Sequence, residues 1–167
     1  MSRVVCLGLA TLDTIFHVPH APDAGGRVVA TELVVAGGGP AATAAVTLSR
    51  LGVETAFVGV VADDEVGAAV RDGLAQEGVD VSELVAVAGA RSPRSSILVD
   101  RRSAARTIVH YPGTVPPVEP SPRALELCRA AACLATGLEE DAEPLRVHGD
   151  AIELSYRPHQ LLTVKVR

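Results

Sequence analysis

Two short segments near the N-terminus carry residues suited to binding oxygen-rich ligands. Asp13 lies in Gly8-Leu9-Ala10-Thr11-Leu12-Asp13, and its carboxylate can accept two hydroxyl hydrogen bonds from a vicinal diol. The second segment, Ala36-Gly37-Gly38-Gly39-Pro40, lets the backbone approach a ligand because glycine has no side chain. Unpaired N–H groups at the start of a following helix would favour ligand oxygens or developing anions. Each segment also has a structural interpretation: a capping or solvated acid, and a bare tight turn.

The elements that would position these residues predict an α/β fold. Three apolar segments are typical of strands: Arg3–Leu9, Val28–Ala36 and Thr55–Val61. Pro40 and Gly52 bracket a helix, because proline suits the first turn and glycine the C-terminal cap. Asp63 or Asp64 can cap a second helix that runs to about Gln76. The order strand, strand, helix, strand, helix indicates a layered domain with parallel pairing, in which Asp13 follows the first strand.

The rest of the chain predicts a hairpin, a connector and a strand-like tail. Ser95–Val99 and Arg106–His110 are typical of two strands joined by a polar turn. Five of the eleven prolines lie between Pro112 and Pro122, which predicts an extended connector. From Ala151 onward apolar and polar residues alternate, as in strands. We therefore divide the chain into residues 1–137 and a divergent tail, 138–167.

Composition argues against several functional classes. The net charge of −5 disfavours a nucleic-acid-binding surface. Of the 15 basic residues only Lys165 is lysine, so no lysine follows a glycine cluster and a P-loop nucleotide site is excluded. The three cysteines lack the spacing of a zinc site or a disulfide framework. Neither a bilayer-spanning run nor a secretion signal is visible, so we expect a cytoplasmic protein without a membrane partner.

Taken together, these motifs resemble the ribokinase-like (PfkB-type) family of carbohydrate kinases, in its N-terminal portion only. The matching features follow the family's order: Gly8 and Asp13, Pro22–Gly26, Gly38-Gly39, Leu51-Gly52, Gly59–Asp64 and Gly67. Ser95–Val99 and Arg106–Ile108 resemble the family's second lid hairpin. The resemblance implies a three-layer αβα sheet, here incomplete, with a small β-strand lid.

The resemblance also implies roles for individual residues. Asp13 would bind sugar hydroxyls, while Gly38 and Gly39 would line the sugar pocket. Thr43 stands where the family has Asn, so it keeps a hydroxyl but loses the amide's paired donor and acceptor. Arg106 would reach a substrate or phosphate oxygen, with a salt bridge inside the lid as the alternative. The implied partner is a small-molecule sugar, and the lid strands could also pair two subunits into a homodimer.

The family's catalytic base belongs to a Gly-Ala-Gly-Asp motif at the start of a helix, whose amides bind the transferring phosphoryl group. This motif does not occur in the sequence. The nearest segment, His148-Gly149-Asp150-Ala151, precedes strand-like residues that offer no helix dipole. ATP and Mg²⁺ are thus implied for the complete family enzyme, whereas we expect no catalytic and no metal-ligating residue in this chain.

Three readings follow for the whole chain. The first is a sugar kinase truncated before its catalytic Asp and ATP site. The second is a non-catalytic sugar-binding or dimerising module derived from such a kinase. The third is a gene remnant that folds poorly because one sheet edge is uncovered.

Two interpretations of the tail stay open. In one, Cys133–Glu139 is the family's next core strand, with Glu139 near the sugar pocket, and the gene is truncated after it. In the other, Leu138–Arg167 is foreign sequence, since Ala151–Arg167 resembles the last strands of family-38 α-mannosidases.

Overall fold

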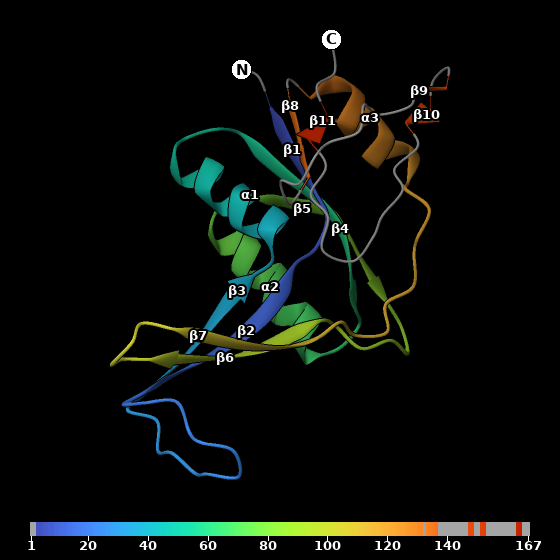
Figure 1. Cartoon of the computed structure of the whole chain (residues 1–167). Coiled ribbons are helices and arrows are strands. Elements are labelled where there is room, and N and C mark those ends of the chain that lie inside the picture. Colours follow the sequence, from blue (N-terminus) through green and yellow to red (C-terminus); the bar gives the residue numbers. More distant parts are fainter. Residues whose placement is uncertain (1–2, 132, 137–146, 149–150, 153–162, 165–167) are drawn as a thin grey trace.

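The computed structural model describes residues 3–131, 133–136, 147–148, 151–152 and 163–164. At its centre lies a five-stranded sheet in the order β11-β8-β1-β4-β5 (Figure 1). Its strands are β1 (Val4–Leu7), β4 (Thr55–Ala62), β5 (Asp80–Val87), β8 (Cys133–Thr136) and β11 (Thr163–Val164). The first four run parallel, and β11 pairs antiparallel with β8. This parallel arrangement confirms the predicted α/β class.

Helices cover both faces of this sheet. Because successive strand residues point to opposite faces, Cys6 and Phe57 pack under α1 (Pro40–Arg50) and α2 (Glu65–Gln76). Val5 and Ala56, their neighbours along the chain, pack instead against α3 (Pro122–Ala130). The result is the three-layer αβα arrangement that the resemblance implied.

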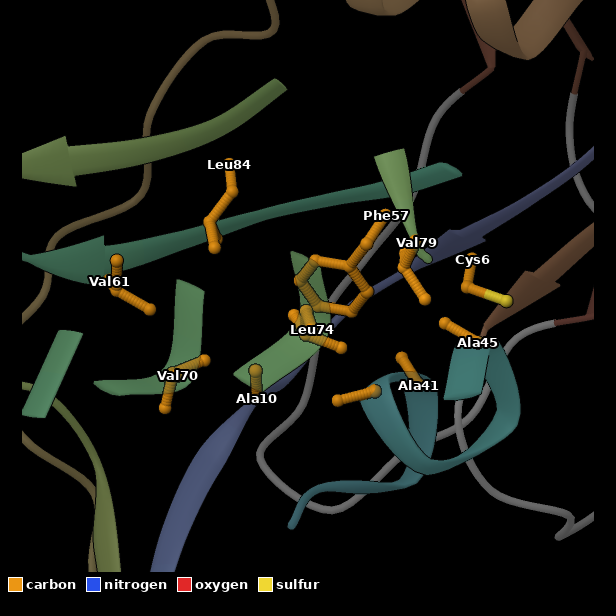
Figure 2. Close-up of a cluster of buried hydrophobic side chains, with 11 residues drawn as sticks. Cys6, Ala10, Ala41, Ala45, Phe57, Val61, Val70, Leu74, Val79 and Leu84 are labelled. Atoms are coloured by element: carbon orange, nitrogen blue, oxygen red, sulfur yellow. The ribbon is translucent and has the colours of Figure 1, made fainter. Parts of the chain in front are cut away.

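The larger of the two cores is built around Phe57. Its ring is fully buried among apolar side chains, including Leu74, Val79 and Cys6 (Figure 2). The buried α1 residues of this core are all alanines, Ala41, Ala42 and Ala45, while Val46 and Leu48 pack against it partly buried. Small side chains let the helix approach the sheet closely.

Helices α1 and α2 begin and end close to the predicted residues. In α1 proline occupies the first turn, and Gly52 follows the last turn with φ +80°. In α2 Asp64, rather than Asp63, is the cap, since its carboxylate accepts a hydrogen bond from the Gly67 N–H at 2.8 Å. Gly78, with φ +79°, follows the end of α2. These signals act locally, which explains why the sequence suffices to locate them.

A second sheet, which we call the lid, projects from one end of the first (Figure 1). Its order is β3-β2-β6-β7. The strands are β2 (Thr11–Val18), β3 (Glu32–Gly38), β6 (Arg94–Asp100) and β7 (Arg106–Tyr111). β6 and β7 form the predicted antiparallel hairpin, while β2 and β6 run parallel.

Three details differ from the predicted elements. β2 was not predicted, because its polar residues Thr11, Asp13 and His17 obscure a strand whose partners are remote in sequence. β5 was also missed. β3 begins at Glu32 rather than at Val28, since residues 28–30 form no regular structure.

Only short pieces of the tail are described. β9 (Val147–His148) and β10 (Ala151–Ile152) pair antiparallel with each other. β10 and β11 lie within the strand-like segment predicted from Ala151 onward, whose other residues lie outside the described parts, whereas β9 precedes it. Among the helices of the described residues, none is long and apolar enough to cross a membrane.

Candidate functional site

Asp13 is the third residue of β2, near the end of the lid that adjoins the central sheet, and its side chain is half-buried. The Thr11 hydroxyl donates a hydrogen bond to Asp13 Oδ1 at 2.9 Å. The carboxylate turns toward Gly38 on β3, so closely that a Cβ atom added at Gly38 would overlap it. The structure therefore brings Asp13 and Gly38 together, and the absence of a side chain at Gly38 leaves room for the carboxylate.

Gly39 connects the lid to α1, and it is the helix's N-cap residue, with φ +91°. A Cβ atom at Gly39 would overlap the backbone oxygen of Leu9, which follows β1. The carboxyl end of β1, the Asp13 carboxylate and the N-terminus of α1 consequently meet at one place. The carboxyl ends of the strands are where open α/β sheets bind ligands, and a helix N-terminus favours ligand oxygens.

Thr43 lies one turn into α1 and is exposed. Its N–H donates to the Gly39 carbonyl at 2.9 Å, and its own carbonyl accepts the Thr47 hydroxyl at 2.8 Å. The residue thus lies on the helix that begins at the glycine turn, within one turn of it. A direct sugar contact by its hydroxyl stays a prediction.

Arg106 is exposed at the far end of the lid. It begins β7 and pairs with Val99, which in turn pairs with His17 of β2. His17 is four residues along β2 from Asp13, so Arg106 lies roughly 13 Å further along the strand direction than Asp13. The structure therefore does not bring Arg106 to the carboxylate, and its proposed role at a substrate or phosphate oxygen stays a prediction.

Two residues that the sequence did not single out share a row with Asp13. Ser95 of β6 pairs with Asp13, and His110 of β7 pairs with Ser95. The Ser95 Oγ lies 3.3 Å from His110 Nδ1. The hairpin alone predicts that Ser95 faces His110, but only the parallel pairing of β2 with β6 places both beside Asp13.

Hydrogen bonds to Asp64 join the lid to the α/β layer. Its carboxylate accepts the Ser92 N–H at 3.0 Å and the Ser92 hydroxyl at 2.7 Å, just before β6 begins. Burial raises the pKa of Asp64, but the hydrogen bonds from Ser92 and Gly67 outweigh this effect and the pKa is lowered overall. One carboxylate therefore caps α2 and also holds the segment that leads into the lid hairpin.

A second carboxylate, Asp100, organises the far end of the lid. It accepts hydrogen bonds from the backbone N–H groups of Ala21, Arg102 and Ser103. The bonds from Ala21 and Ser103 are the main reason that the pKa of Asp100 falls to about 2. This carboxylate closes the β6–β7 turn and ties the loop after β2 to it.

Among the described residues, no group of three or more His, Cys, Asp or Glu side chains is arranged to hold a metal ion. Gly149 and Asp150 lie outside the described residues, and the segments on either side of them, β9 and β10, are strands rather than a helix start.

Known proteins share both sequence and fold with this chain. It is similar to ketohexokinase from Mus musculus, at 30% identity over 116 residues that cover 70% of this chain and 39% of that protein. It is similar to ribokinase from Haemophilus influenzae, at 29% identity over 97 residues that cover 58% of this chain and 32% of that protein. The structure of Arabidopsis thaliana ribokinase complexed with ribose and ATP matches its fold with a TM-score of 0.67 at 22% identity, covering 80% of this chain and 44% of that one.

The chain thus spans 39% or less of the length of these two curated relatives. The sequence pattern of the family described as pfkB family carbohydrate kinase matches residues 1–137. That match covers most of the chain and includes every element that forms the candidate site. The chain therefore belongs to the pfkB family of carbohydrate kinases.

Proposed function

We propose that this chain forms the sugar-binding side and the lid of an ATP-dependent carbohydrate kinase. The observation that carries the proposal is the Asp13 carboxylate, which lies over Gly38 beside the N-terminus of α1. A carboxylate accepts two hydroxyl hydrogen bonds, and a vicinal diol supplies them at the right spacing. The Arabidopsis ribokinase is described in complex with ribose, and the similar mouse protein is a ketohexokinase, so pentoses and ketohexoses are the first sugars to test.

In the complete enzyme these residues would bind and orient the sugar. Asp13 would accept the diol protons, and the glycine turn would let the sugar approach the backbone. Bound ATP with Mg²⁺ would supply the phosphoryl group and neutralise its charge. We expect such a kinase to act in the cytoplasm.

We further propose that the chain by itself transfers no phosphoryl group. The support is the absence of Gly-Ala-Gly-Asp from the sequence together with the strand at Ala151–Ile152. An ATP-consumption assay with D-ribose, D-fructose and other common sugars should give no sugar-dependent turnover. Turnover well above the no-sugar background would overturn this proposal.

Sugar binding is tested separately from turnover, by thermal unfolding. A sugar that binds only the folded chain stabilises it by about 2.7 kcal/mol at a concentration of 100 times its Kd. We expect Asp13→Asn to lose this stabilisation while unfolding normally without sugar. Equal sugar-dependent shifts in both proteins would remove Asp13 from the binding site.

The alternative, a dimerising module, rests on a different observation. Large apolar side chains are exposed on the lid face that points away from Asp13: Leu33 (59%) and Val35 (58%) on β3 and Val109 (65%) on β7. Exposed apolar side chains on one face mark interaction sites, and a second lid would cover them. Sedimentation should therefore detect a dimer that Val109→Lys dissociates. A wild-type chain that stays monomeric at high concentration would exclude this module.

A further inference from the structure

On the lid face that carries Asp13, one row of paired residues across the four strands has polar side chains, and the next row has apolar side chains. The polar row runs across the strands through Asp13, Ser95 and His110, beginning at Ala36. Two residues further out, the same face carries four aliphatic side chains: Val34, Ile15, Ile97 and Ile108. A few convergent polar groups bordered by apolar ones are typical of a small-ligand site.

Both hairpin residues of this row are shielded from solvent. Ser95 is only 8% exposed. His110 is half-buried, whereas the other residues of β7 are exposed. A buried hydroxyl needs a hydrogen-bond partner, and Ser95 has His110 Nδ1 at 3.3 Å. When the hydroxyl donates to Nδ1, the neutral ring carries its proton on Nε2, which becomes a donor.

From this row we infer that His110, oriented by Ser95, is a specificity-determining residue that donates a hydrogen bond to a sugar oxygen. The inference rests on the proposed sugar site at Asp13. Asp13 can only accept hydrogen bonds when ionised, whereas His110 Nε2–H donates. Two strand spacings separate them, about 10 Å between Cα atoms. The pair therefore selects sugars that present a diol at one end and an acceptor oxygen at the other.

The test compares sugar affinity in His110→Leu, His110→Gln and the wild-type chain. The probes are D-ribose, D-fructose and their monodeoxy derivatives, and calorimetry gives the dissociation constants. Leucine removes the donor, so we expect affinity to fall about threefold to tenfold, as for one neutral hydrogen bond. Glutamine keeps an N–H donor and should recover part of the loss. Wild type should bind one of the monodeoxy sugars more weakly than it binds the parent sugar. His110→Leu should bind that monodeoxy sugar and its parent with equal affinity.

A matched control is His17→Leu, on the same lid face but four residues along β2 from Asp13. We expect this variant to keep wild-type affinity, and circular dichroism should show that all variants are folded. If wild type binds neither parent sugar, or Asp13→Asn binds as tightly as wild type, the proposed sugar site and this inference both fail. If Asp13→Asn loses binding but His110→Leu keeps wild-type affinity and the same ranking of deoxy sugars, only the role of His110 is overturned.

Discussion

Gly38→Ala is the sharpest perturbation of the candidate site, because the added Cβ atom would occupy the space of the Asp13 carboxylate. The obstacle is the end of a short side chain rather than backbone, so the carboxylate can rotate away. Rotation breaks the Thr11–Asp13 hydrogen bond, which costs about 0.5–1.5 kcal/mol, and a strained rotamer adds a similar amount. We expect a loss of about 1–3 kcal/mol in the free energy of unfolding, together with a loss of sugar binding of tenfold or more.

Gly37→Ala is the matched control on the same strand. A Cβ atom added at Gly37 meets nothing within 4 Å, and Gly37 has no positive φ. Its replacement should be neutral or stabilising by up to about 1 kcal/mol, because alanine restricts the unfolded chain. Urea denaturation measures the stability of both variants, and calorimetry with D-ribose or D-fructose measures binding.

The double variant Gly38→Ala with Asp13→Ala separates the two effects. Removal of the carboxylate removes the steric conflict, so the stability cost of Gly38→Ala should shrink in the Asp13→Ala background, while binding stays absent. The reasoning would be refuted if Gly38→Ala behaved like Gly37→Ala in both assays. Additive stability changes would equally show that the two side chains do not compete for one space.

Two further predictions concern stability. Phe57→Ala should lower the free energy of unfolding, measured in urea, by about 3–5 kcal/mol, because it empties the centre of the larger core. The control Leu51→Ala, at a side chain that is 74% exposed, should change the free energy of unfolding by less than about 0.5 kcal/mol. Equal effects of the two substitutions would contradict the assigned core. The pKa of Asp100 is lowered in the fold to about 2, so its contribution to stability is present above pH ~4 and is lost as the pH falls toward 2. Acid unfolding should show this loss in wild type and not in Asp100→Asn, and identical acid profiles would argue against the hydrogen bonds to Ala21, Arg102 and Ser103.

Part of the site could be predicted because its signals are local. Gly38, Gly39 and Pro40 lie next to one another in sequence, and the start of α1 follows from proline's fixed φ and glycine's lack of a side chain. The β6–β7 hairpin is also local, since its two strands are joined by a short polar turn. The resemblance to the carbohydrate kinases rests on these same segments.

To predict the position of Asp13, local sequence signals were not enough. Its segment was interpreted as the chain following the first strand, whereas it is a lid strand paired with β3 and β6. Strand β6 begins about eighty residues later in the chain, and no property of Thr11–Val18 alone specifies that partner. Pairing between remote strands depends on how the α/β layer places both of them, and Asp64 contributes by joining α2 to Ser92.

The sequence by itself therefore determined α1, α2, the glycine turn and the family, because caps, turns and hydrophobic periodicity depend on near neighbours. Tertiary structure alone decided which side chains meet. It placed the Asp13 carboxylate over Gly38, put Ser95 and His110 in the same row, and left Arg106 at the far end of the lid. The physical reason is that strand register is set by non-local pairing, and a shift of one residue would turn every side chain of a strand to the opposite face.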